Sequence, residues 1–406
     1  MIKRFDKMKV LWICGLPNDV RLNACEKVLS PTPTAAWTWI LGHLPPPDGV
    51  ELHIVCPVGG LYASRVDFEY NGVYWHCFRR HRFELPLLWF RFYLQIKRFV
   101  KELNPDVIHG WGGETGCGRV ATLLSKRAIV SVQGLLLLYW QLSKVDARED
   151  YKPSIKTKLA WMVEKLTYKK AAKLLVESVA SKRGLKEYYG LDGELLCHPL
   201  RNEFLLSDLS KRESVAEYPL KLVFVGSLVA RKGAIDAVQA FVNAKLPSSS
   251  LVMIGDGCDR DKVLNLIKEN GIVGQVQMRA SLSPAEIVSE FSDAQFFLLP
   301  SYGDTGPTAL KEALACGLYP ICYDNSGPKD LISHYGCGRL VETSDVGGLT
   351  FAIKECIDQK VACVNNALKA ANKVRNELSR ESVWGELTRI YNLQMELTRG
   401  ATGGYT

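Results

Sequence analysis

Three loops in the second half of the sequence combine glycines, cations and carboxylates, the residue types that an anion-binding site needs. The first loop, 226–233, reads Gly-Ser-Leu-Val-Ala-Arg-Lys-Gly and lies between an apolar run and a helical pattern. Glycines allow a tight turn, a helix N-terminus offers free N–H groups, and Arg231 and Lys232 add formal charge. The loop, which starts at Gly226 and Ser227, therefore suits a diphosphate. An ordinary strand–helix turn with solvated basic residues is the alternative.

The other two loops add backbone amides and acids. One is a glycine turn that contains Gly257, and the other reads Pro-Ser-Tyr-Gly-Asp-Thr-Gly-Pro-Thr, in which Asp304 precedes Thr305 and Gly306. The amides of this last loop lie at a predicted helix start and form a second anion cradle. Glu312 follows in that helix, where a carboxylate can accept two hydrogen bonds from a vicinal diol such as a ribose. A solvated helix charge is the alternative for Glu312.

The elements that must position these loops are short apolar strands that alternate with helices. The apolar runs followed within two residues by Gly or Pro are 10–14, 51–56, 106–109, 128–132, 220–225, 250–254 and 294–299. Strands that are apolar throughout, with helices between them, predict parallel sheets covered on both faces. Ligands of such sheets bind outside the carboxyl ends of the strands, so the loops after the strands are the candidate sites.

The strand–helix rhythm starts twice, which predicts two Rossmann-like domains. We expect the N-terminal domain over residues 1–205, a polar linker after it, and the C-terminal domain over 219–385. A C-terminal helix at 386–399 is expected to pack back on the N-terminal domain, and 400–406 is expected to be a disordered tail.

Composition restricts the class of protein and the cellular compartment that we expect for it. The 406 residues carry a formal net charge of +8, which suits an anionic partner or serves solubility alone. No run reaches the length of a membrane-spanning helix, and the first apolar run is too short for a signal peptide, so we expect a cytoplasmic protein. Twelve cysteines without a Cys-x-x-Cys pair predict reduced thiols, and no clustered metal ligands are visible.

One segment, 299–320, resembles the signature of the family 4 retaining glycosyltransferases (glycosyltransferases group 1), which have the GT-B fold. In that signature a strand ends in Pro-Ser, an acid follows, and a glutamate comes after seven intervening residues, as Asp304 and Glu312 do here. Lys232 and the glycine after it resemble the family's diphosphate loop. Two positions depart from the family, because Ser227 replaces the usual Arg and Asp304 replaces the usual Glu.

The resemblance covers 220–332 and implies an α/β GT-B molecule with two Rossmann-like domains that face each other across a central cleft. It implies that Lys232 and Arg231 neutralise the donor diphosphate, that Glu312 holds the ribose, and that Asp304 contacts the donor sugar or the transferring centre. The implied reaction moves a sugar from a nucleoside-diphosphate sugar to an acceptor hydroxyl, with no metal or other cofactor, in polysaccharide or glycolipid synthesis. A sugar-nucleotide epimerase and a non-catalytic sugar-nucleotide-binding protein are the alternatives.

The resemblance implies that the acceptor binds at strand-end loops of the N-terminal domain. The candidate residues are Gly15, His109, Trp111, Glu114 and Gln133. A tryptophan face can stack on the C–H groups of a pyranose, and a carboxylate can bind its hydroxyls. For His109 and Glu114 a role outside the site remains the alternative.

A basic and aromatic segment, 79–101, suggests where a lipid-linked acceptor could be met. It contains seven Lys or Arg residues and one acid, Glu84, with aromatic residues interleaved. This composition favours docking on anionic lipid headgroups at the inner face of a membrane, and a helix core face is the alternative for its aromatic residues. No motif predicts a nucleic-acid partner. The partners that the resemblance implies are the nucleotide-sugar donor and a glycan or lipid-linked acceptor.

Overall fold

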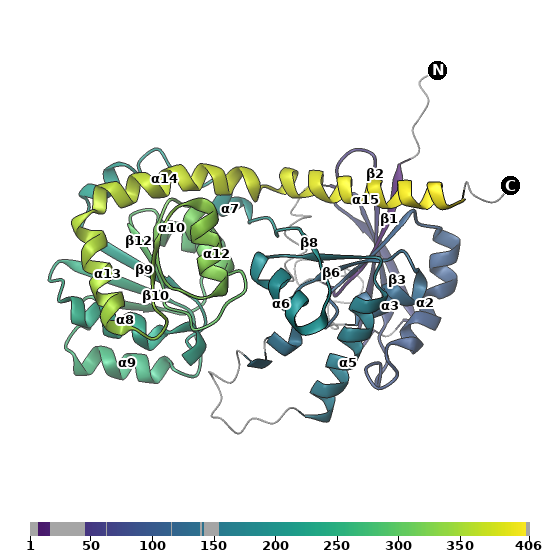
Figure 1. The fold of residues 1–406 in the computed structure, drawn as a ribbon, viewed down its shortest axis with the longest axis horizontal. Coiled ribbons are helices and arrows are strands. Elements are labelled where there is room, and N and C mark those ends of the chain that lie inside the picture. Colours follow the sequence, from purple (N-terminus) through teal and green to yellow (C-terminus); the bar gives the residue numbers. More distant parts are fainter. Residues whose placement is uncertain are drawn as a thin grey trace, which may run out of the picture. The chain divides into compact units, whose positions relative to one another are not determined.

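The chain forms two compact α/β units in a computed structural model (Figure 1). The model describes residues 7–16, 45–61, 63–114, 116–138, 140–141 and 154–402, with side chains up to residue 397. The first unit takes the described residues up to 138, residues 154–199 and helix α15 (Arg380–Thr402). The second unit takes residues 140–141 and 200–379. The α/β class predicted from the sequence is therefore confirmed in both units.

The first unit is built on an eight-stranded sheet with the order β3-β4-β2-β1-β5-β6-β7-β8. Its strands are β1 (Met8–Ile13), β2 (Val50–Val58), β3 (Arg65–Tyr70), β4 (Val73–Arg79), β5 (Val107–Trp111), β6 (Ile129–Val132), β7 (Lys173–Val176) and β8 (Glu194–Leu195). Neighbouring strands run parallel except β3 and β4, which form an antiparallel hairpin at one edge. The carboxyl ends of the parallel strands therefore share one edge of the sheet.

Helices cover this sheet on both faces, and strand β1 shows why its sequence is apolar throughout. The other helices of the unit are α2 (Phe90–Leu103), α3 (Cys117–Leu124), α5 (Ile155–Lys170) and α6 (Val179–Tyr189). Leu11 and Ile13 pack with α2 and α3, whereas Val10 and Trp12 pack with α15. Since successive side chains of a strand point to opposite faces, a strand with two covered faces has no polar positions to offer.

Helix α15 supplies one face of the first unit's core from far along the chain. Its core residues, at helical spacing, are Val383, Trp384, Leu387, Ile390 and Tyr391. This spacing produces one apolar stripe on the helix. The helix begins at Arg380 and continues to Thr402, so it extends beyond both ends of the range expected from sequence. Residues 403–406, the remainder of the expected tail, lie outside the described residues.

The segment around helix α2 divides its apolar residues between the core and the surface. Phe92, Ile96 and Val100 are buried one turn apart. Phe90 and Leu94, on another side of the helix, are 50% and 54% exposed. The expected core face therefore exists, and it leaves other apolar side chains of the segment in solvent. No helix among the described residues is long and apolar enough to cross a bilayer.

The second unit has a six-stranded, wholly parallel sheet with the order β11-β10-β9-β12-β13-β14. Its strands are β9 (Leu220–Val225), β10 (Ser249–Ile254), β11 (Val276–Arg279), β12 (Phe296–Leu299), β13 (Tyr319–Tyr323) and β14 (Arg339–Val341). Its helices are α7 (Asn202–Leu205), α8 (Ala234–Ala244), α9 (Arg260–Glu269), α10 (Pro284–Phe291), α11 (Thr308–Ala315), α12 (Ser326–Tyr335), α13 (Val346–Asp358) and α14 (Lys360–Glu377). Helices α8 and α13 share one apolar core with the sheet.

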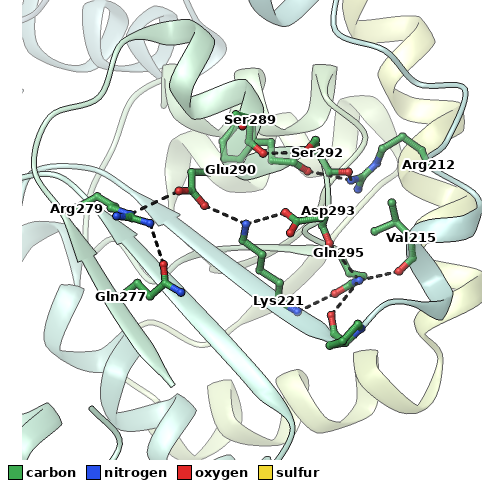
Figure 2. A network of polar contacts seen from close by, with 12 residues as sticks. Arg212, Val215, Lys221, Gln277, Arg279, Ser289, Glu290, Ser292, Asp293 and Gln295 are labelled. Atoms are coloured by element: carbon green, nitrogen blue, oxygen red, sulfur yellow. Dashed lines mark hydrogen bonds and ion pairs between the residues drawn. The ribbon is translucent and has the colours of Figure 1, made fainter. Parts of the chain in front are cut away.

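The polar segment expected as a linker packs on the second unit instead (Figure 2). Arg212 is 2% exposed and donates to the Gly317 carbonyl at 2.7 Å, and Gln295 donates to the Val215 carbonyl at 2.7 Å. These polar side chains satisfy buried backbone carbonyls, which is a core function that composition alone does not reveal. The division between the units lies after Pro199, before the boundary expected near residue 219.

Candidate functional site

The carboxyl ends of β9 and β10 meet so closely that only glycines fit there. A Cβ atom on Gly255 would lie 2.0 Å from the Gly226 carbonyl oxygen, and one on Gly257 would lie 2.3 Å from the Leu228 carbonyl oxygen. The backbone amide of Leu228 donates to the Asp256 carbonyl at 2.9 Å. Packing therefore requires glycine at 255 and 257, whereas a Cβ atom on Gly226 would make an ordinary contact with Phe224 at 3.6 Å. Gly226 and Gly257 are both expected donor contacts, and Ser227, next to Gly226, is exposed.

The loop after β9 also touches the loop after β12. Gly233 precedes helix α8 with φ +68°, and a Cβ atom there would lie 1.9 Å from the Pro300 carbonyl oxygen. The Tyr302 amide donates to the Arg231 carbonyl at 2.8 Å. A residue with a side chain at position 233 would push the two loops apart, so glycine is needed both for the left-handed backbone and for the contact.

The two loops bring together the cation and the acid that the sequence predicts for the site. Lys232 Nζ forms an ion pair with Asp304 Oδ2, and the two side chains are 18% and 15% exposed. Arg231 lies beside them but donates through Nη1 to the Gly303 carbonyl at 2.9 Å. A partly buried lysine and carboxylate at the carboxyl ends of parallel strands can bind a ligand that carries both phosphate charge and hydroxyls.

The loop that carries Asp304 leads directly into a helix start. Helix α11 begins at Thr308, after Pro307, and Thr305 is buried in the turn before it, next to Gly306. The Gly327 amide donates to the Asp304 carbonyl at 2.9 Å, which fixes the loop from the β13 side. The amides of Leu310 and Lys311 donate to the Pro307 carbonyl at 3.2 and 3.3 Å. An anion cradle formed by the amides that precede them stays a prediction.

Glu312 lies in the second turn of α11 and is 9% exposed. Burial raises the pKa of this carboxyl to about 7; the charge of Arg201 opposes the shift, and that of Glu203 adds to it. A carboxyl near its midpoint at neutral pH can accept hydrogen bonds when charged and donate one when protonated. Glu312 is therefore a polar group, able to form hydrogen bonds with a ligand, on a largely apolar helix face.

In the first unit, His109 and Trp111 lie inside the core. His109 is 0% exposed; its Nδ1 is 2.7 Å from Tyr391 Oη and its Nε2 is 2.8 Å from Ser131 Oγ. Burial lowers the pKa of His109 to about 3. Trp111 is 2% exposed and stacks on the His109 ring with centroids 4.5 Å apart. In this arrangement neither ring presents a face to an acceptor, which corrects the expectation of a tryptophan sugar platform.

Glu114 and Gln133 are placed differently, at the carboxyl ends of the neighbouring strands β5 and β6. Both are half-buried, and Glu114 Oε2 and Gln133 Nε2 have no hydrogen-bond partner among the described residues. Burial raises the pKa of Glu114 to about 8, with contributions from Glu164 and Glu177. Gly15, after β1, is exposed.

Two acids near Glu114 were not predicted as site residues. Glu177 follows β7, and Glu164 lies on α5 with 0% exposure, where Tyr189 and Tyr168 donate to it. The strand-end position of Glu177 was a signal that could have pointed to it, whereas nothing in the helical pattern distinguishes Glu164. Among the residues that the structure describes, no group of three His, Cys, Asp or Glu side chains could hold a metal ion.

Two family models match the chain, one on each half. The model described as "Glycosyl transferases group 1" matches residues 207–376, and the one described as "Glycosyltransferase Family 4" matches residues 42–197. Most of residues 42–197 belong to the first unit, and residues 207–376 lie within the second unit. Each unit is therefore matched by a glycosyltransferase model.

Two curated relatives each match less than half of the chain. A glycogen synthase of Mycobacterium tuberculosis is 22% identical over 175 residues, which are 43% of this chain and 42% of that enzyme. The amylovoran biosynthesis glycosyltransferase AmsK of Erwinia amylovora is 27% identical over 188 residues, 44% of this chain and 46% of AmsK. The chain thus spans less than half the length of these two relatives.

Solved structures match the fold over nearly the whole length. Sucrose-phosphate synthase from Thermosynechococcus elongatus superimposes with a TM-score of 0.72 at 15% identity, covering 96% of this chain and 100% of that one. Anabaena HepE, solved with UDP-glucose, gives a TM-score of 0.66 at 12% identity, covering 95% and 99%. At these identities the likeness concerns the fold, and both proteins have the GT-B fold.

Proposed function

The chain belongs to the family 4 glycosyltransferases, and from this membership we propose that it moves a sugar from a nucleoside-diphosphate sugar to an acceptor hydroxyl with retention of configuration. The observation that carries the proposal is the ion pair of Lys232 with Asp304, which joins two strand-end loops of the second unit. The cation and the acid that transfer requires are adjacent there, beside the first turn of α11.

The charge of these loops supports binding of the donor there. As the bond between the sugar and the diphosphate breaks, negative charge develops on the leaving phosphate oxygens. Lys232, with Arg231 beside it, and the amides of Thr305 and Gly306 stabilise that charge without a metal. Asp304 faces the donor sugar, whose anomeric carbon becomes positive, and Glu312 holds the ribose hydroxyls. The departing phosphate oxygen takes the acceptor proton, so no protein base is required.

The acceptor is assigned to the first unit. Glu114 and Gln133, at adjacent strand ends, offer a carboxyl oxygen and an amide N–H that have no hydrogen-bond partner among the described residues, which suits a sugar hydroxyl. The name of the relative AmsK refers to amylovoran biosynthesis. This name supports the proposal that the acceptor is a growing polysaccharide or glycolipid.

We further place the protein in the cytoplasm, in peripheral contact with an anionic membrane surface. The exposed apolar side chains near the start of α2 are Phe83, Leu87, Phe90 and Leu94, with 71%, 49%, 50% and 54% exposure. Exposed cations, among them Arg91, Lys97 and Arg98, lie beside them. Apolar side chains among cations are the composition that inserts into headgroups of anionic lipid.

The test is a panel of nucleotide sugars, screened by thermal shift and then incubated with and without simple glycoside acceptors. The expected result is transfer that needs the acceptor, releases a nucleoside diphosphate, and falls at least about tenfold in Lys232→Ala, because a charged hydrogen bond to the leaving group is lost. Lys262→Ala, on α9, is the control and keeps its activity. Rapid C2 epimerisation of a donor incubated alone would refute the proposal.

A further inference from the structure

Asp236, in the first turn of α8, accepts two tyrosine hydroxyls on one oxygen. Tyr302 Oη and Tyr323 Oη each lie 2.7 Å from Asp236 Oδ2. A carboxylate that accepts two hydroxyl donors forms short, strong hydrogen bonds. Neither the sequence motif nor the proposed transfer chemistry gives this residue a role.

The three residues of this Asp236–tyrosine contact come from three different elements of the second unit. Asp236 follows Lys232 by one helical turn, Tyr302 precedes Asp304 by two residues in the loop after β12, and Tyr323 ends strand β13. The carboxylate therefore joins the helix next to the cation with the loop that carries the acid.

The two tyrosines differ in how firmly their surroundings hold them. Tyr323 is 0% exposed, and its strand pairs with β12 on one side and β14 on the other. Tyr302 is half-buried in a loop and meets the Tyr323 ring edge-on, with centroids 5.7 Å apart. Without its hydroxyl, Tyr323 would still be fixed by the sheet. Tyr302 would lose the contact that fixes its side chain to α8.

Backbone contacts of the same loop show how closely its position follows that of the cation. The Tyr302 amide and Ser301 Oγ both donate to the Arg231 carbonyl, at 2.8 and 3.2 Å. Arg231 in turn donates to the Gly303 carbonyl. A shift of the loop would therefore change the distance between Lys232 and Asp304.

We propose that Asp236, acting through Tyr302, is a positioning residue that sets the spacing between Lys232 and Asp304. The proposal rests on the proposed function, because the spacing affects turnover only if both groups contact the donor. Positioning errors of about 1 Å at a transferring centre are enough to reduce a rate a hundredfold. Binding of the nucleotide through other contacts would change less.

The experiment compares Tyr302→Phe with Tyr323→Phe, since each removes one hydroxyl from the same carboxylate oxygen. Tyr302→Phe is expected to lower kcat about tenfold while the donor KM changes less than threefold. Tyr323→Phe is expected to leave both kcat and the donor KM within threefold of the wild-type values. The two variants are expected to lower the melting temperature by similar amounts. Equal kinetic effects of the two variants, or none in Tyr302→Phe, would overturn the proposal.

A second measurement does not depend on activity. Hydrogen exchange of peptides that cover 300–308 is expected to be severalfold faster in Tyr302→Phe and unchanged in Tyr323→Phe. Equal exchange in the wild type and Tyr302→Phe would reject the positioning role. A wild-type protein that transfers no sugar would refute the proposed function, and the exchange result would still decide the role of Asp236.

Discussion

Glu312 shows how one buried carboxyl can make donor binding depend on pH. Its pKa is raised to about 7 by burial, so the carboxylate predominates above pH 7 and the neutral acid below it. Because only the carboxylate accepts hydrogen bonds from both ribose hydroxyls, the donor KM is expected to rise several-fold between pH 8 and pH 6. Glu312→Gln should have a high KM at both pH values. A wild-type KM that is flat over this range contradicts the assigned contact.

We expect His109 to make the stability of the first unit sensitive to acid. Its folded pKa of about 3 lies below the ordinary value of 6.5, so the unfolded chain takes up a proton that the folded chain refuses. The stability that this residue contributes is present above pH 6.5 and is lost as the pH falls. The loss is about 1.4 kcal/mol per pH unit, or roughly 2 kcal/mol at pH 5.

The measurement for His109 is denaturant unfolding at pH 7 and pH 5, followed by tryptophan fluorescence. Trp12 and Trp111 are ring neighbours of His109, and of the described tryptophans only Trp140 belongs to the second unit, so the signal reports mainly the first unit. Glu114 and Glu164, whose pKa values are raised, favour the folded state on acidification, so the comparison with His109→Gln is what isolates the histidine. An equal loss in both proteins would count against the explanation.

At the scale of elements, Gly233 fixes the distance between the loops after β9 and β12. It shares its backbone conformation with Gly271, since their φ angles are +68° and +66°. A Cβ on Gly233 would meet the Pro300 oxygen, whereas one on Gly271 would meet nothing within 4 Å. We expect Gly271→Ala to cost about 1 kcal/mol of unfolding free energy and Gly233→Ala about 3 kcal/mol or more, with loss of transfer.

Circular dichroism during urea unfolding measures the unfolding free energy of both glycine variants. The Gly271 variant serves as the control for the left-handed backbone, because the two changes are chemically identical. Similar losses in the two variants would mean that the contact with Pro300 does not hold the loops together.

The surface near α2 gives a prediction about lipid. Phe90→Ser with Leu94→Ser removes two half-exposed apolar side chains, each of which would gain about 1 to 2 kcal/mol on entering headgroups. Sedimentation with vesicles of anionic phospholipid should show at least about tenfold weaker binding. Phe351→Ser on α13, at a site that is 64% exposed in the second unit, is the control. Unchanged binding of the double variant would exclude this surface as the contact.

The sequence predicts best those parts of the fold and of the site that depend on residues close together in the chain. Asp304 and Glu312 lie in one continuous motif with Gly and Pro signals on both sides, so their element and their spacing could be read directly. Asp236 was missed because its tyrosine partners are 66 and 87 residues away. His109 was expected at the site and lies in the core for a similar reason, because the hydroxyl that fixes its ring comes from Tyr391, 282 residues later. Strand-end position alone does not distinguish a ligand contact from a core contact.

At the scale of the whole molecule, the first unit depends on helix α15. Ending the chain at Ser379 would remove five core side chains, among them Trp384 and Tyr391, and would leave Trp12 without its hydrogen bond to Tyr391 Oη at 2.8 Å. At about 1.5 to 3 kcal/mol for each buried apolar side chain, the loss is on the order of 10 kcal/mol, comparable to the stability of a domain. We expect the first unit to unfold and the second unit to remain folded.

Limited proteolysis with mass spectrometry distinguishes these outcomes, since it identifies which unit is cut. A chain that ends at residue 397 keeps the core stripe and is the control. A protease-resistant first unit in the shorter chain would show that α15 is dispensable for it.

The position of α15 in the chain also affects how the protein is made. The first unit's strands leave the ribosome early, but the helix that covers Trp12 is synthesised only after residues 200–379. At roughly 5 to 20 residues per second, this interval is on the order of 10 to 40 s. During that time the nascent sheet exposes one apolar face, which is the surface that a ribosome-associated chaperone would meet. The second unit is complete before α15 is synthesised, so it can fold while the first unit still lacks this helix.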